Sequence, residues 1–213
     1  FGNSFNVIHC GVDHKKFTNT SSSSFFVNGH SIDKDSYLFH LSRFVPRKNP
    51  DKLFNIYRDL KNENSLKDLK LIIGGKGWKD PVSKYKTEYP NLSKDIIYLG
   101  FVRDEDLALL YSNALAFLFF STYEGFGMPL MEAMSCKCIT ITNNKFSLPE
   151  IALPESVFDL DKDNKAIIKY LKTLSLDKNK REIIKNANYT KSLNFDWNIT
   201  AKNFFKLINN SAE

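Results

Sequence analysis

The most informative feature of this sequence is a repeated alternation between short, wholly apolar runs and segments with helical periodicity. The alternation begins at Tyr37 and continues almost to the end of the chain. Apolar runs this short are typical of strands that are covered on both faces. Strands of this kind, separated by helices, predict a parallel sheet wound by right-handed crossovers. We therefore expect an α/β fold with a Rossmann-like, doubly wound parallel sheet.

The boundaries of the expected elements follow from the same pattern. Strands are predicted at residues 37–41, 69–73, 96–99, 116–120 and 138–142. Helices are predicted to begin at Pro50, Asp104 and Pro129, with three more at residues 164–174, 177–189 and 196–209. Residues 1–36 lack the alternation, and their Ser-rich stretch predicts a junction segment and a linker. This gives a Rossmann-like domain at residues 37–192 and a C-terminal helical segment at residues 193–213.

Length and composition exclude several classes of protein. With 213 residues, 42% hydrophobic and 25% charged, the chain is long enough for one full core and is not disordered overall. Its longest apolar run, residues 114–120, is far shorter than the ~20 residues of a membrane-spanning helix. The first residue is Phe1 rather than Met and no signal-peptide pattern is present, so we expect a piece of a longer chain. An odd number of cysteines without a disulfide framework, at positions Cys10, Cys136 and Cys138, predicts a reducing, cytoplasmic location.

The net charge of +6 favours anionic partners, such as a nucleotide, a nucleic acid or an anionic membrane surface. A solvated surface rich in lysine is the simpler explanation. Because the sequence has neither a basic recognition helix nor an aromatic RNA-binding motif, no nucleic-acid partner is expected.

The segment with the most chemical content is residues 121–132, Ser-Thr-Tyr-Glu-Gly-Phe-Gly-Met-Pro-Leu-Met-Glu. A buried strand leads into two glycines, which let the backbone approach a ligand closely, and then into a helix. The N–H groups at a helix N-terminus suit phosphate. Glu124 and Glu132 flank this turn, and carboxylates accept hydrogen bonds from sugar or ribose hydroxyls. The alternative is a capped turn in which Glu132 only complements the helix dipole.

Other strand ends carry weaker signals. Arg43 and Lys48 follow the first predicted strand and could clamp a diphosphate, although the neighbouring Arg47 indicates that exposed cations occur there anyway. The turn containing Gly74 and Gly75 lacks the Walker A spacing, but its backbone could approach a ligand. The backbone after residue 100 could contact the edge of a base.

Taken together, these motifs resemble those of the C-terminal, donor-binding domain of family 4 glycosyltransferases with the GT-B fold. The segments that carry the resemblance are residues 40–44 with Lys48, 71–77, 98–102, 124–132, 148–151 and 195–197. A further segment, residues 7–13, is similar to the family's interdomain junction, with His9 and Cys10 in place of Pro-Asn. The spacing of the two glutamates within residues 124–132 is the most specific of these signals.

The resemblance implies a role for each matching residue. Arg43 and Lys48 would neutralise the donor diphosphate, Glu132 would hold the nucleotide ribose, and Glu124 would face the transferred sugar. Further donor contacts would come from the glycine turn, the segment beside the base and the backbone after Glu124, that is, from Gly74, Gly75, Phe101, Val102, Gly125, Phe126, Gly127, Met128, Pro129 and Leu130.

The reaction implied is transfer of a hexosyl group from a nucleoside diphosphate sugar, UDP- or GDP-linked, to an acceptor hydroxyl with retention of configuration. The resemblance implies no resident cofactor and no metal. It also implies an N-terminal acceptor domain that is absent from this sequence, against which the C-terminal helix would pack and through which the protein could contact the inner face of a membrane. The alternatives are a GT-B-like epimerase and a module that binds a nucleotide sugar without catalysis.

Overall fold

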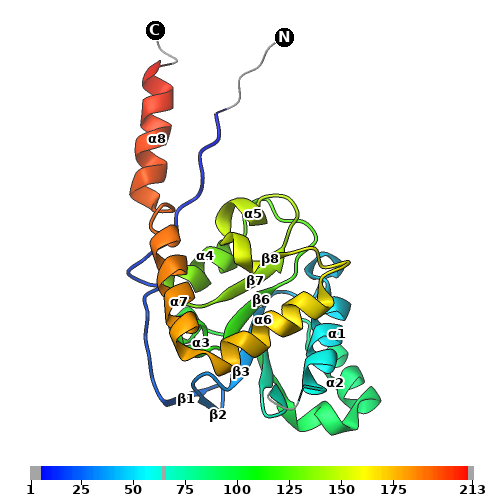
Figure 1. The fold of residues 1–213 in the computed structure, drawn as a ribbon. Helices are drawn as coiled ribbons and strands as arrows, with labels where there is room; N and C mark the ends of the chain where they lie inside the picture. Colours follow the sequence, from blue (N-terminus) through cyan, green and yellow to red (C-terminus); the bar gives the residue numbers. More distant parts are fainter. Residues whose placement is uncertain (1–5, 64–65, 211–213) are drawn as a thin grey trace.

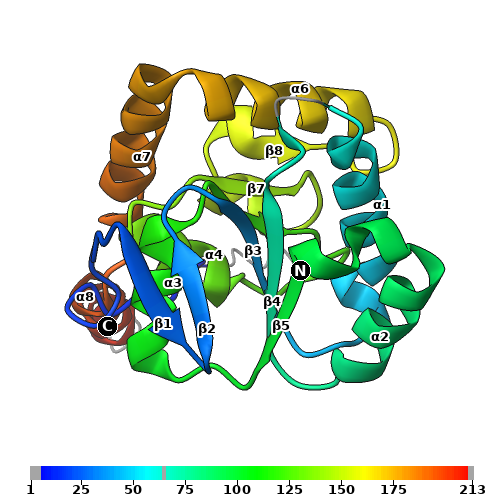
Figure 2. The ribbon, with the colours of Figure 1, turned by 90° about the horizontal axis from the view of Figure 1, so that it is seen from below.

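A six-stranded parallel sheet forms the centre of the computed structural model, which describes residues 6–63 and 66–210 (Figures 1 and 2). The strand order is β5-β4-β3-β6-β7-β8, and every neighbouring pair is parallel. The strands are β3 (Tyr37–Leu41), β4 (Lys70–Gly74), β5 (Ile96–Gly100), β6 (Ala116–Phe119), β7 (Thr140–Asn143) and β8 (Val157–Phe158). The predicted Rossmann-like α/β fold is confirmed.

Helices cover both faces of this sheet, because successive side chains of each strand point to opposite faces. On β3, Leu38 packs into one core and Phe39 into the other, and both are fully buried. The first core is covered by α1 (Pro50–Lys61), α2 (Lys79–Glu88) and α6 (Asn164–Leu176). The second core is covered by α3 (Asp104–Asn113), α4 (Met128–Ser135) and α5 (Leu148–Ile151). Figure 2 shows α3 and α4 on one side of the sheet and α1 and α2 on the other.

A small antiparallel hairpin, β1 (Ser24–Val27) and β2 (His30–Asp33), lies beside α3 on the second face. Phe25, Val27 and Ile32 point inward and are buried in the second core. Asn28 and Gly29 form its turn, both with positive φ. The prediction of a linker is therefore wrong for residues 24–33, which belong to the packed body.

The end of the chain projects from that body. Helix α7 (Lys178–Ser192) packs on α4, and α8 (Trp197–Asn210) then extends away beside the N-terminal segment (Figure 1). A β-bridge joins Val12 to Asp196, and Gly11 packs so closely under Trp197 that a Cβ there would lie 2.2 Å from the Trp197 nitrogen. Among the described residues, no helix is long and apolar enough to cross a membrane.

The order of the strands determines where a ligand can enter. From β3 the chain proceeds outward to β4 and β5, then crosses back and places β6 on the other side of β3. The loops after β3 and β6 therefore diverge at a switch in topology, and in open α/β sheets the binding crevice lies beyond the carboxyl ends of such strands. These loops contain Arg43, Lys48 and Glu124.

Candidate functional site

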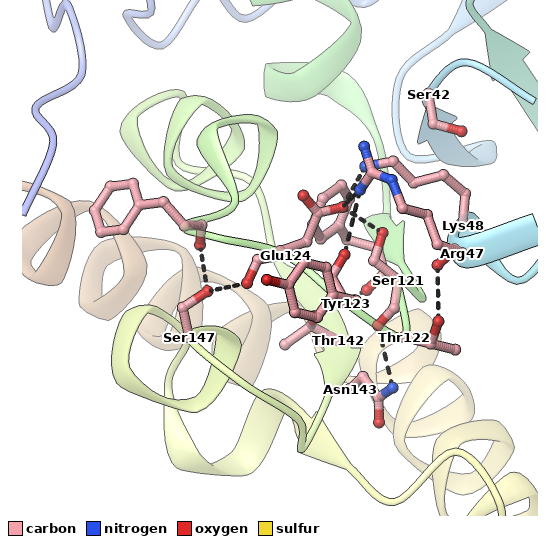
Figure 3. A network of polar contacts seen from close by, with 12 residues as sticks. Ser42, Arg47, Lys48, Ser121, Thr122, Tyr123, Glu124, Thr142, Asn143 and Ser147 are labelled. Carbon is pink, nitrogen blue, oxygen red and sulfur yellow. Dashed lines mark hydrogen bonds and ion pairs between the residues drawn. The ribbon is translucent and has the colours of Figure 1, made fainter. Parts of the chain in front are cut away.

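The loops after β3 and β6 are joined directly to each other. The Thr122 N–H donates to the Arg47 carbonyl oxygen at 2.8 Å, and the Thr122 hydroxyl donates to the same oxygen at 3.2 Å (Figure 3). The Arg47 guanidinium reaches back across the junction and donates to the Tyr123 carbonyl oxygen at 3.2 Å. The two loops thus form one rigid wall at the switch point.

Glu124 lies at the centre of this wall. Its Oε1 accepts hydrogen bonds from the Ser121 hydroxyl at 2.7 Å, from Arg47 Nη1 at 2.9 Å and from Lys48 Nζ (Figure 3). The Glu124 side chain is only 12% exposed. No hydrogen bond to Oε2 is present from any described residue, so this oxygen is left available for a donor such as a sugar hydroxyl.

Lys48 is held in an environment unfavourable to its charge. Its side chain is 10% exposed and its Nζ lies 4.6 Å from the centre of the Phe119 ring. Burial lowers the pKa of Lys48, while the hydrogen bond and the charge of Glu124 oppose that change. A cation desolvated in this way interacts strongly with an incoming phosphate.

The two arginines of the loop after β3 are arranged differently from the sequence expectation. Arg43, expected beside Lys48, is exposed, and its guanidinium contacts no polar group of another described residue. Arg47, which the sequence analysis set aside as an ordinary surface cation, is the one that bonds Glu124 and joins the loops. No pattern within the loop distinguishes these two arginines. Their difference arises from the single-turn 3-10 helix Pro46–Lys48, which directs Arg47 and Lys48 towards β6.

The turn before α4 presents free backbone amides. In the part of the chain that the structure describes, the N–H groups of residues 125–128 donate to no other residue. Gly127 caps the helix with a φ of 105°, a conformation that favours glycine. Pro129 has no N–H, and the N–H of Leu130 already donates to the Gly127 carbonyl oxygen. Of the donor-contacting backbone predicted at residues 125–130, residues 125–128 therefore keep N–H groups that can donate to an anion.

Glu132 occupies a separate environment on the inner side of α4. Its Oε2 accepts a hydrogen bond from the Tyr111 hydroxyl of α3 at 3.3 Å. Burial raises the pKa of Glu132 to about 7, opposed by this hydrogen bond and by Lys16, and reinforced by Asp104. The two glutamates share no hydrogen-bond partner among the described residues.

A buried polar cluster supports the loop after β3 from below. His40 lies between β3 and β6, where its Nδ1 donates to the Leu118 carbonyl oxygen and its Nε2 accepts from the Ser42 hydroxyl, both at 2.9 Å. Burial lowers the pKa of His40 to about 4, so the ring is neutral at pH 7. The Trp78 indole N–H donates to the Ser42 carbonyl oxygen at 2.8 Å. Gly75 packs against this same oxygen, which a Cβ at Gly75 would approach to 2.0 Å.

The segment predicted beside a base is divided between surface and core. Phe101 is 66% exposed, whereas the Val102 side chain is buried in the second core. Val102 packs so closely on Gly74 that a Cβ added at Gly74 would lie 2.9 Å from a Val102 methyl group. Only the backbone of Val102 can therefore meet a ligand. The Asn28 amide of the hairpin donates to the carbonyl oxygens of Leu99 and Phe101, both at 2.8 Å, and so fixes this segment.

The described residues contain no group of three or more histidine, cysteine, aspartate or glutamate side chains suited to hold a metal ion. The chemistry that these loops offer is that of cations, backbone amides and carboxylates. Such a set can neutralise a polyanion and orient hydroxyl groups.

Comparisons with known proteins show which family this chain belongs to. Residues 23–191 match the family model described as "Glycosyl transferases group 1". The O-antigen chain mannosyltransferase B of Escherichia coli is 34% identical over 175 residues, which cover 81% of this chain and 46% of that protein. The chain thus spans about half the length of this curated relative.

Solved structures show the same fold. The C-terminal domain of a glycosyl transferase group 1 family protein from Francisella tularensis has a TM-score of 0.68 at 20% identity, covering 85% of this chain and 96% of that one. The pneumococcal O-GlcNAc transferase, solved with UDP and GlcNAc, has a TM-score of 0.70 at 20% identity, covering 83% of this chain and 36% of that one. The chain belongs to the glycosyl transferases group 1 family and has the Rossmann-like fold of a GT-B glycosyltransferase domain.

Proposed function

We propose that this chain is the donor-binding half of a retaining glycosyltransferase. The enzyme transfers a hexosyl group from a nucleoside diphosphate sugar to an acceptor hydroxyl in the synthesis of a surface polysaccharide. Its partner in the reaction is an N-terminal acceptor-binding domain, and the protein acts in the cytoplasm, at or near the inner face of the membrane. The relationship to an O-antigen chain mannosyltransferase supports the polysaccharide assignment and makes a mannosyl donor the first to test.

The observation that carries the proposal is the convergence of cations and free amides around Glu124 at the switch point. Lys48 and Arg47 already bond one carboxylate oxygen, and the unpaired N–H groups of residues 125–128 follow directly in the chain. A diphosphate satisfies both sets at once, because it offers several anionic oxygens to cations and to the N-terminus of α4.

In the transition state of the transfer, negative charge develops on the departing nucleoside diphosphate and positive charge develops on the sugar ring. We assign neutralisation of the leaving group to Arg43, Lys48 and the amides before α4, which act most strongly where water is excluded. Glu124 orients the sugar through its open Oε2 and stabilises the positive charge on the ring. Glu132 holds the ribose, and the exposed Phe101 lies beside the base.

The test is a transfer assay on the full-length protein with UDP- and GDP-linked hexoses, together with calorimetric titration of the donor nucleotides. Glu124→Gln keeps the shape of the side chain but removes its charge. It is expected to lower kcat by about 100-fold or more and to change donor affinity by less than about threefold, because only interactions that strengthen in the transition state raise the rate.

The matched control is Glu132→Gln, which is expected to raise the KM for the donor with little change in kcat. Binding of the donor without any transfer by the wild-type protein would favour the binding module. Conversion of the donor sugar to its epimer, without an acceptor, would favour the epimerase.

A further inference from the structure

Two exposed aromatic side chains meet at the rim of the site. Tyr123, which precedes Glu124, is 57% exposed, and Phe146, in the loop between β7 and α5, is 60% exposed. Their ring centres are 4.7 Å apart and the rings are inclined by 75°, an edge-to-face pair. Neither ring belongs to either core.

This pair is fixed relative to Glu124. The Ser147 hydroxyl, next to Phe146, lies 3.2 Å from the Glu124 carbonyl oxygen and 3.0 Å from that of Phe126 (Figure 3). The loop that carries Phe146 is thereby attached to the backbone that carries Tyr123 and Glu124. A molecule in contact with both rings therefore lies next to the segment that carries Glu124.

The backbone of Phe146 adopts a conformation that folding alone does not favour for this residue. Its φ is 56°, in the left-handed region, where a bulky side chain is a rare exception. Glycine would occupy the position without strain, and the exposed ring gains little from packing in return. Strain that persists at a surface position beside a site indicates a role for the side chain in binding.

We propose that Tyr123 and Phe146 form a stacking platform for a sugar ring of the acceptor glycan, an assignment that rests on the proposed function. The C–H groups of a pyranose face pack on aromatic rings, so the exposed faces of this pair can hold a sugar ring. Glu124 and the backbone amides that follow it are assigned to the donor, so the two rings, which are more than half exposed, are the part of this rim that remains for the acceptor. An acceptor chain that extends into solvent fits such a surface.

The experiment compares Phe146→Gly and Tyr123→Ser with the wild type in the full-length protein. Each is expected to raise the KM for the acceptor by about 3- to 10-fold, the loss corresponding to one aromatic contact, and to leave the KM for the donor within about twofold. Phe146→Gly is also expected to keep or raise the melting temperature, because it relieves the strained backbone. Phe26→Ser is the matched control, since Phe26 is exposed on the hairpin away from this rim, and it should alter neither KM.

Three outcomes would contradict the assignment of Tyr123 and Phe146 as an acceptor-binding platform. Unchanged acceptor KM in both variants shows that the rings do not bind the acceptor. A rise in donor KM assigns them to the donor sugar. A fall in melting temperature in both variants assigns them to packing against another domain.

Absence of transfer by the wild type with every donor is a different result, which counts against the proposed function. In that case nuclear magnetic resonance titration of the 213-residue chain with methyl α-mannoside and mannobiose decides the matter. Shifts of the Tyr123 and Phe146 ring signals support the platform, and unchanged signals reject it.

Discussion

Lys48 shows how a residue placed for binding can oppose folding. Burial lowers its pKa, so in the folded protein the charged form is disfavoured relative to the unfolded chain. A lysine whose pKa is lowered by folding imposes no cost at a pH above its pKa in the unfolded chain, where it is neutral in both states. As the pH falls below that value, the unfolded chain binds the proton more readily and the folded state loses stability. At pH values where Lys48 is charged in both the folded and the unfolded chain, the cost of burying this charge is fully present.

Lys48→Met, which keeps the apolar stem and removes the charge, is expected to raise the melting temperature at pH 7. The same variant should bind UDP or GDP at least tenfold more weakly than the wild type, while its affinity for the corresponding nucleoside changes little, because a charge-assisted contact to phosphate contributes about 1.5–3 kcal/mol. Thermal melts and calorimetric titrations measure both effects. A lower melting temperature with unchanged affinity for the diphosphate would assign Lys48 a purely structural role.

Glu132 gives the protein a pH dependence near neutrality. Its folded pKa of about 7 lies above that of an unfolded glutamate, so the protonated form is favoured by folding. This contribution to stability is complete below the unfolded value of roughly 4.3 and is lost as the pH rises through 7. Glu132→Gln should therefore be more stable than the wild type at pH 8 and similar to it near pH 4.5.

Glu132 also links pH to nucleotide binding, but higher pH should strengthen binding whereas it lowers the stability of the fold. Ribose hydroxyls donate to the ionised carboxylate, so affinity should increase from pH 6 to pH 8 and binding at pH 7 should release a proton. Titrations in two buffers of different ionisation enthalpy measure that release. In Glu132→Gln it should disappear, and a release that persists would place the titrating group elsewhere.

At the scale of elements, the site depends on close backbone contact between β3 and β4. Gly75 has a φ of 110° and packs on the Ser42 carbonyl oxygen, so an added Cβ meets backbone that cannot move aside. Gly75→Ala is expected to destabilise the fold by about 2–4 kcal/mol, from conformational strain together with overpacking.

Gly29→Ala is the matched control for this change. Gly29 also has a positive φ, 80°, but nothing lies within 4 Å of its added Cβ, so only the conformational cost of about 1 kcal/mol applies. Denaturant unfolding of the two variants compares these costs. If both variants lose the same free energy of unfolding, the close contact of Gly75 with Ser42 adds nothing to the cost of the Gly75 substitution.

The elements that could be predicted from sequence are those with a strong apolar pattern. The strand at residues 37–41 is predicted with its observed bounds, and the other four predicted strands differ by one or two residues. The sixth strand, β8, has only two residues and no apolar run, so the pattern does not predict it. Helix α2 escapes prediction because it buries only Val82 and Tyr85 and has Pro81 in its first turn. The hairpin is not predicted because the Ser-rich stretch before it is typical of a linker. The Asn28-Gly29 pair between alternating apolar residues is nevertheless a hairpin signal.

The site could be predicted as far as its motifs but not its contacts. The spacing around Glu124 and the cations after β3 indicates a site at the strand ends. That Arg47 rather than Arg43 bonds Glu124 depends on the local helical turn at residues 46–48, which no spacing specifies. The inward orientation of Val102 is likewise set by its packing against Gly74.

On the scale of the whole molecule, the folded body does not require α8. Neither hydrophobic core includes any residue of this helix, and its large side chains Trp197, Phe204, Phe205 and Ile208 are about half exposed or more. Deletion of residues 202–213 is therefore expected to change the melting temperature by less than about 2 °C and to leave nucleotide affinity unchanged. Scanning calorimetry of the shortened chain checks this, and a drop of 5 °C or more would show that α8 supports the body.

The position of Trp78 makes its intrinsic fluorescence a probe of ligand binding at this site. Its indole is fully buried, bonded to Ser42 and edge-on to the rings of His40 and Phe44, whereas the second tryptophan, Trp197, is half exposed on α8. The fluorescence of Trp78 is emitted at shorter wavelength and is shielded from dissolved quenchers, while that of Trp197 is accessible to iodide. With Trp197 quenched, the remaining light comes from beneath the loop that holds Arg43 and Lys48. Occupation of that loop can then be followed in real time without attaching a dye.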